Sequence, residues 1–252
     1  MEDVARALGR EPMEYRYQIV MPKGYVDGFS KNENYYDTFR QVMDKGRTAI
    51  DYDRKRKAYE NQTGPVRRGV GMALFWYNTA VWPISLESSS CRMVLNQDGS
   101  VQVQTGETEI GQGCDTAYAQ MAADAVGVPF EDVHIMSTQD TDISPFGTGA
   151  YASRQTYSGS FSIRQTGLLL KDRILRYAAE LTGQMRENMD LIDGQVVRKN
   201  DGRVLMPLSE LALTALYSTT HSQHLTAEST YQIKSNAYSF GCTFAEVEVD
   251  IP

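Results

Sequence analysis

A glycine-rich stretch between a predicted strand and a predicted helix constrains the fold of this chain more than any other feature. The stretch runs from Gly106 to Gly113, after the strand-like Val101–Gln104 and before residues 115–126, where strong helix formers place apolar side chains at helical spacing. Glycines there let the backbone approach a ligand closely, and the first N–H groups of a helix have no partner within it. The stretch therefore suits an anion or a polar heterocycle, although its spacing alone fits a plain β–α connection equally well.

A second glycine-bearing loop precedes another predicted helix. Residues 148–154, Thr-Gly-Ala-Tyr-Ala-Ser-Arg, lead into a helix expected over most of residues 151–181, with Gly183 as its stop. In a compact β–α–β unit both loops would open at the same edge of the sheet. Two helix starts in one crevice predict a long ligand with several phosphate or pterin-like polar groups.

The remaining patterns predict a mixed fold of the α+β (mixed α/β) class. Asp98-Gly99 predicts a hairpin between two short strands, 89–95 and 100–104. Further helices are expected at residues 3–8, 38–59 and 207–216, and further strands at 69–77 (buried), 133–136, 191–197 (a strand–turn–strand), 225–233 and 243–249. We expect a helical and loop segment over residues 1–66 and an α/β segment over residues 67–252.

Composition excludes several classes of protein. The net charge of -7 argues against a broad surface for nucleic acid or an anionic membrane. No apolar run approaches the roughly 18 residues of a spanning helix, and the acidic N-terminus lacks the order of a secretory signal. Three widely spaced cysteines form no disulfide framework, zinc ligand set or four-cysteine cluster. A cytoplasmic protein is therefore expected.

Several motifs, in order, resemble one known family. They are Thr108–Gly113, then Val126–Pro129, Asp140–Asp142 and Gly149–Arg154, with matching passages at Val4–Arg16 and Phe244–Asp250. Together they resemble the large, molybdopterin-binding subunit of the xanthine oxidase family. That family comprises xanthine dehydrogenases, aldehyde oxidoreductases and related molybdenum hydroxylases, and the resemblance covers essentially the whole chain.

The resemblance implies a cofactor and its contacts. The cofactor would be molybdopterin, either without a nucleotide or in its cytosine dinucleotide form, held largely by backbone N–H groups and by a glutamine side chain. The implied cofactor-binding residues are Gly111, Gln112, Gly113, Ala150, Tyr151, Ala152, Ser153 and Arg154. The implied reaction is hydroxylation of a purine, N-heterocycle or aldehyde, with 2Fe-2S and FAD centres on other domains or subunits as partners.

Two elements of the family pattern are missing from this chain. The family has a glycine-rich loop upstream and a catalytic glutamate in a Gly-Glu context downstream, whereas Gly106-Glu107 stands before the cofactor loop, in the wrong order. We therefore expect a middle-to-late segment of the large subunit that has no catalytic residue or metal ligand of its own and is inactive in isolation. A non-catalytic cofactor-binding or cofactor-assembly module is the alternative, and a nucleotide-phosphate binder is disfavoured because no Walker-type lysine is present.

Overall fold

The chain folds into two compact units. The computed structural model describes residues 1–29, 31–84, 87–136 and 140–251. One unit comprises residues 1–78 and 236–252, and the other comprises residues 79–235. These limits differ from the expected segments 1–66 and 67–252, because the strands near residues 70 and 240 belong to the same unit. The expectation that the cofactor-binding segment lies within residues 67–252 stays a prediction.

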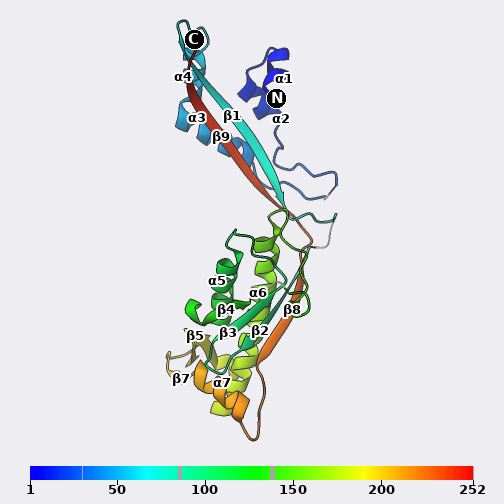
Figure 1. The fold of residues 1–252 in the computed structure, drawn as a ribbon, viewed down its shortest axis with the longest axis vertical. Coiled ribbons are helices and arrows are strands. Elements are labelled where there is room, and N and C mark those ends of the chain that lie inside the picture. Colours follow the sequence, from blue (N-terminus) through cyan, green and yellow to red (C-terminus); the bar gives the residue numbers. More distant parts are fainter. Residues whose placement is uncertain (30, 85–86, 137–139, 252) are drawn as a thin grey trace. The chain divides into compact units, whose positions relative to one another are not determined.

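The described part of the first unit contains a two-stranded sheet and four helices. The sheet pairs β1 (Val66–Thr79) with β9 (Ala237–Asp250), the two long ribbons in Figure 1. The helices are α1 (Glu2–Ala7), α2 (Pro12–Ile19), α3 (Thr38–Ile50) and α4 (Tyr52–Ala58). A small core of Met13, Met43, Tyr52 and Val70 lies between helices and sheet, and the ring of Tyr52 meets that of Phe244 edge to face at 5.6 Å.

Two predictions about this unit are wrong. The helix expected over residues 38–59 is interrupted at Asp51, whose left-handed backbone (φ 58°) separates α3 from α4. Aspartate tolerates this conformation better than most residues. The helical periodicity of the sequence continues across Asp51 and therefore did not reveal the break. The strand at 69–77 forms but is not buried along its length: of its side chains only Val70 is fully buried. Large apolar side chains of β1 such as Phe75 and Trp76 are 55% and 46% exposed.

The second unit is built on a four-stranded sheet with the order β4-β3-β2-β8. Its strands are β2 (Ser88–Leu95), β3 (Val101–Thr105), β4 (Val133–Met136) and β8 (Thr226–Gln232). The predicted hairpin is confirmed, with Met93 opposite Val103 in an antiparallel pair. β3 and β4 run parallel and are joined by α5 (Cys114–Val126), which gives the expected β–α–β unit.

Two helices of this unit position the candidate site. α5 and α6 (Arg154–Thr182) pack against each other and against the sheet, as Figure 1 shows. Alternate residues of β2 and β3, among them Met93 and Val103, are fully buried in the resulting core. Both helices begin at the same edge of the sheet as the loops that the sequence singled out, and both end at a left-handed glycine, Gly127 and Gly183.

A small antiparallel sheet completes the second unit. It has the order β5-β6-β7, with β5 (Met189–Ile192), β6 (Gln195–Arg198) and β7 (Val204–Pro207), and it precedes α7 (Leu208–Tyr217). The β5–β6 pair confirms the predicted strand–turn–strand, whereas β7 was not predicted. Within the described residues, no helix is long and apolar enough to cross a membrane.

Candidate functional site

The first loop, Gly106–Gly113, forms an irregular turn between β3 and α5. Gly111 and Gly113 have φ angles of 96° and 83°, a region that glycine adopts without steric strain. Neither glycine lies in a helix or strand. The predicted loop, on which the ligand-binding interpretation depends, is therefore confirmed. Gly113 is the N-cap of α5, so the loop places the helix start at the edge of the sheet.

The carboxylate of Glu109 caps this helix start. It accepts hydrogen bonds from the backbone N–H groups of Gly111 (2.6 Å), Gly113 (3.1 Å) and Asp115 (3.2 Å). These donors stabilise the charged form and lower the pKa of Glu109 to about 2. The chain thus uses these donors itself, and a ligand could reach the N–H groups of Gly111 and Gly113 only by displacing Glu109.

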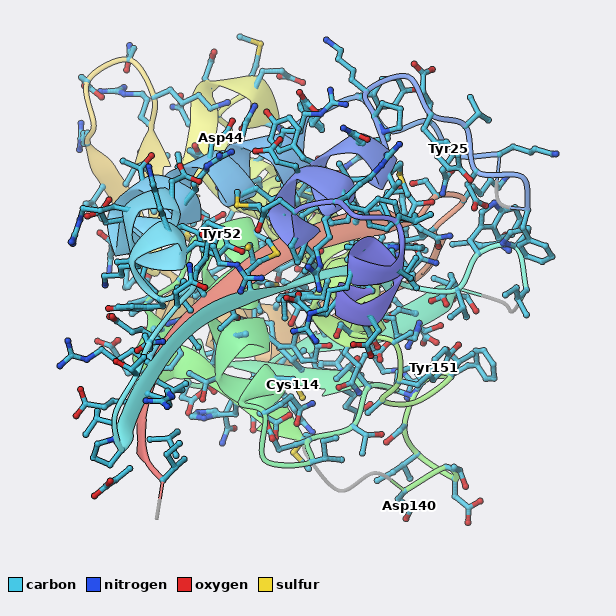
Figure 2. The ribbon with its side chains drawn as sticks, turned by 90° about the horizontal axis from the view of Figure 1, so that it is seen from above. Tyr25, Asp44, Tyr52, Cys114, Asp140 and Tyr151 are labelled. Carbon is cyan, nitrogen blue, oxygen red and sulfur yellow. The ribbon has the colours of Figure 1, made fainter. Side chains whose placement is uncertain are left out.

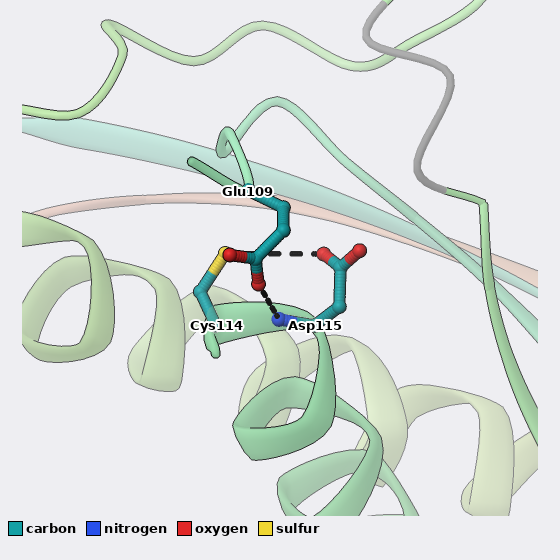
Figure 3. Close-up of side chains that lie close together, drawn as sticks. All are labelled: Glu109, Cys114 and Asp115. Atoms are coloured by element: carbon teal, nitrogen blue, oxygen red, sulfur yellow. Dashed lines mark hydrogen bonds between the residues drawn. The ribbon is translucent and has the colours of Figure 1, made fainter. Parts of the chain in front are cut away.

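Glu109, Cys114 and Asp115 form a tight cluster at this cap (Figure 3). One potential ligand atom from each lies within 4.8 Å of the others. Cys114 is only 2 % exposed, and burial together with the two neighbouring carboxylates raises the pKa of its thiol to about 12. Cys114 is thus a packed residue of the α5 start rather than a reactive thiol. The cluster is a helix cap, and no further observation points to a metal there.

The second loop presents a helix start that no side chain of the described residues caps. Ala152 and Ser153 adopt left-handed φ angles of 48° and 51°, and Ser153 is the N-cap of α6 without a side-chain hydrogen bond. The carbonyl of Ala152 accepts from the N–H of Ala80 at 2.9 Å, which fixes the turn. α6 has 29 residues, so the positive end of its dipole is fully developed. This helix start, rather than that of α5, is suited to an anion.

The two loops converge on one pocket. The side-chain amide of Gln112 donates from Nε2 to Oε1 of Gln155, in the first turn of α6, at 2.6 Å. The same Nε2 donates to the carbonyl of Thr108 (2.9 Å), and Oε1 of Gln112 accepts from the N–H of Ile110 (2.7 Å). A pocket of about 340 Å³ opens beside this contact, lined by Ile110, Gln112 and residues 150–156. Figure 2 labels Cys114, the first residue of α5 directly after the first loop, and Tyr151 in the second loop.

Most of the predicted cofactor-binding residues line this pocket. They are Gln112, Ala150, Tyr151, Ala152, Ser153 and Arg154, whereas Gly111 and Gly113 shape the turn beside it. Gln155 and Thr156 also line the pocket and were not predicted. Their position in the first turn of α6 was available from the sequence, but nothing in the residue types distinguished them.

Arg154 does not point into the pocket with its side chain. The guanidinium is fully buried and bonded to Glu87 (2.7 Å) and Glu107 (2.9 Å), both of them fully buried as well. Its remaining hydrogen bonds go to the carbonyls of Ser88 (2.8 Å) and Gly149 (3.1 Å). Burial raises the pKa of Glu107 despite the opposing charge of Arg154. The guanidinium is therefore engaged within the protein, and the predicted part of Arg154 in cofactor binding would fall to its backbone.

Comparison with known proteins identifies the family of this chain. Residues 45–252, most of the chain, match the sequence model of the molybdopterin cofactor-binding domain. The chain belongs to this family. The resemblance to xanthine dehydrogenase-type enzymes that the motifs indicated is thereby confirmed.

Individual relatives extend the comparison. A xanthine dehydrogenase molybdenum-binding subunit of Escherichia coli O157:H7 is 40% identical over 252 residues, which is 100% of this chain and 34% of the relative. Quinoline 2-oxidoreductase from Pseudomonas putida 86 superposes with a TM-score of 0.75 at 26% identity, over 99% of this chain and 34% of its own. A Cu,Mo-CO dehydrogenase shares the fold, with a TM-score of 0.75 at 20% identity. The chain thus spans about a third of the length of these relatives, and the expected mixed α/β fold is confirmed.

The pocket fits molybdopterin on structural grounds. Its lining combines an uncapped helix start, which favours a phosphate, with the amides of Gln112 and Gln155, which suit the donors and acceptors of a pterin. The small residues Ala150, Ala152 and Ser153 leave the backbone of the second loop accessible to a ligand.

Proposed function

We propose that this chain is the cofactor-binding part of a molybdenum hydroxylase of the xanthine dehydrogenase type. The substrate would be a purine, an N-heterocycle or an aldehyde. One observation carries the proposal: the two loops, 43 residues apart at Gln112 and Gln155, meet at 2.6 Å beside a pocket that ends on the start of α6. The names of the relatives, which include a xanthine dehydrogenase subunit and a quinoline oxidoreductase, support the substrate classes.

Each part of the pocket has a distinct role in this proposal. The first-turn N–H groups of Gln155 and Thr156 bind the cofactor phosphate, because they carry the positive end of the helix dipole and no side chain of the described residues caps them. The N–H of Arg154 already donates to the carbonyl of Tyr151 at 3.1 Å. Gln112 hydrogen-bonds the polar part of the cofactor, exchanging one of its present partners for it. The backbone from Ala150 to Ser153 closes one wall of the pocket. When bound, molybdopterin supplies the molybdenum centre at which a substrate C–H bond is hydroxylated.

The chain's own carboxylates near the pocket do not serve as a general base. Glu107 is fully buried and held by Arg154, and Glu109 is held by three backbone donors with a pKa near 2. A general base must reach the proton that it removes and have a pKa near the working pH. We therefore assign the general base to another part of the enzyme and expect this chain to be inactive by itself.

The finer features of the proposal follow the family. The cofactor is molybdopterin, without a nucleotide or as the cytosine dinucleotide. 2Fe-2S and FAD centres on other domains or subunits would be its redox partners, and the rest of the large subunit would be the immediate partner. The enzyme is cytoplasmic and binds neither nucleic acid nor a membrane.

Replacing Gln112 by Ala in the complete product of the gene tests the proposal. Loss of one hydrogen bond to a strongly polar group is worth about 1.5–3 kcal/mol, so affinity for the cofactor should fall by about ten- to a hundredfold. The measurement is molybdenum and pterin content of the purified protein, together with its thermal midpoint. Gln120→Ala, at an exposed position of α5, is the matched control and should leave the content unchanged. Unchanged cofactor content in Gln112→Ala would contradict the proposal.

A non-catalytic cofactor-binding or assembly module is the second candidate. One observation favours it: the carboxylates beside the pocket are not free to act as a general base. Glu109 caps α5, and Glu107 is paired with Arg154 in a buried ion cluster. Stoichiometric cofactor binding without turnover of purines, N-heterocycles or aldehydes by the complete gene product would identify such a module.

A further inference from the structure

The side chain of Arg154 binds four residues in three segments of the second unit. Its Nε donates to Glu87, Nη1 donates to Glu107 and to the carbonyl of Gly149, and Nη2 donates to the carbonyl of Ser88. These partners lie just before or at the start of β2, at the start of the first loop and in the second loop. The guanidinium thus connects both loops of the pocket to the start of β2.

Close backbone contact reinforces the same junction. A Cβ atom on Gly106 would lie 2.3 Å from the backbone nitrogen of Gly147, and one on Gly147 would lie 2.2 Å from the carbonyl oxygen of Gly106. Gly147 also forms a β-bridge with Ser89. The first loop therefore touches the main chain just before the second loop, directly beside the ion cluster.

A polar path leads from this cluster to the pocket. Gln155 follows Arg154 in the first turn of α6 and is only 6 % exposed, and its Oε1 accepts from Gln112. Any rotation of the α6 start moves Gln155 and with it the amide of Gln112. The position of Gln112 therefore depends on how firmly the α6 start is held against the first loop.

We propose that Arg154 is a positioning residue for the cofactor pocket: it fixes the start of α6 against the Gly106–Gly113 loop, so that Gln155 and Gln112 meet. It acts through these two amides rather than by touching the ligand. The inference deepens the proposed function, on which it rests only for the identity of the ligand. Preorganisation of this kind holds a site in its binding geometry through residues behind it.

The chemistry of guanidinium explains why this position requires arginine. Arginine offers five N–H donors in a planar fork, whereas a lysine ammonium is a compact point charge with three donors. Lysine at position 154 would keep the charge opposite Glu87 and Glu107 but could not reach both carboxylates and both carbonyls. The conservative substitution should therefore preserve the fold better than it preserves the pocket.

The side-chain amide signals of Gln112 test this inference in the 252-residue protein itself. NMR spectra of Arg154→Lys should show displaced Gln112 and Gln155 side-chain amide signals, and exchange of the Gly111 and Gly113 amides should accelerate about tenfold or more. Arg92→Lys is the matched control, because Arg92 also pairs with a glutamate from a neighbouring strand, Glu228, but is 41% exposed. Its Gln112 signals should stay in place. A purely structural role would lower stability without moving these signals below the unfolding transition.

A second variant keeps the test decisive if Arg154→Lys does not fold. Glu107→Gln retains an oxygen that accepts from Arg154 and should shift the Gln112 signals less than Arg154→Lys would, and in the same direction. A folded Arg154→Lys or Glu107→Gln protein with the Gln112 signals of the wild type would overturn the inference, as would an equal shift in Arg92→Lys. Absence of cofactor binding by the wild-type gene product would instead refute the proposed function, since the spectra of the chain do not depend on the ligand.

Discussion

Substitution of Gly106 by Ala probes the main-chain contact between the first loop and the segment just before the second loop. The added Cβ would lie 2.3 Å from the nitrogen of Gly147 and 2.4 Å from the carbonyl oxygen of Pro145, both main-chain atoms. Main chain cannot move aside as a flexible side chain can, so one of the two segments must shift. Overpacking typically costs about 1–3 kcal/mol, and a rigid backbone contact places the expected loss at about 2–3 kcal/mol.

Urea unfolding followed by circular dichroism measures this loss. With a slope of about 2 kcal/mol per M, a loss of about 2–3 kcal/mol lowers the midpoint of the affected transition by about 1–1.5 M. Gly71→Ala is the control, since a Cβ there meets nothing within 4 Å and its backbone conformation is ordinary, so its midpoint should barely change. Gly147→Ala invades the same contact from the other side, and the double variant should lose less than the sum of the two. Equal midpoints for Gly106→Ala and Gly71→Ala would refute this close main-chain contact.

Three further outcomes follow from the site and the core. The carboxyl of Glu109 should titrate near pH 2 by ¹³C NMR, because its pKa is lowered in the folded state. Its stabilising effect is therefore complete above the unfolded pKa of about 4.3 and is lost as the pH falls from there towards 2. A titration midpoint near 4.3 would contradict the cap. Cys91 and Cys114, both buried and with pKa values raised to about 12, should resist a thiol reagent at pH 8 until urea unfolds the protein, and rapid labelling of the native protein would be the opposite result. Leu170→Ala, at a fully buried position of α6, should destabilise the protein by about 2–5 kcal/mol in urea unfolding, whereas Leu169→Ala, at a position that is 41% exposed, should change stability far less.

The sequence predicted those parts of the fold that local patterns determine. The limits of α5 and α6 followed from apolar periodicity and from glycines at their ends, because a left-handed residue stops a helix wherever it occurs. The β2–β3 hairpin followed from Asp98-Gly99 in the same way. The break at Asp51 was not predictable, since aspartate is also an ordinary residue in an exposed helix.

The sequence predicted which segments form the site but not what the individual side chains do there. The motif located the loop containing Gln112 and the loop before α6, and the structure brings them together. It did not show that Arg154 points inward, because the partners that hold it, Glu87 and Glu107, stand 67 and 47 residues away in the chain. Nor did it show that Glu109 occupies the donors of Gly111 and Gly113, which depends on the path of the folded loop. Tertiary partners of this kind are not encoded in local spacing.

The position of molybdenum in crystals of the cofactor-loaded gene product tests the central claim most directly. Anomalous scattering at the molybdenum edge locates the metal independently of the protein map, and the pterin density shows which residues bind it. We predict a peak beside the pocket, with density for the cofactor in contact with Gln112, the Ala150–Ser153 backbone and the first-turn N–H groups of α6. A molybdenum peak remote from this pocket, with the Gln112–Gln155 contact undisturbed, would contradict the account.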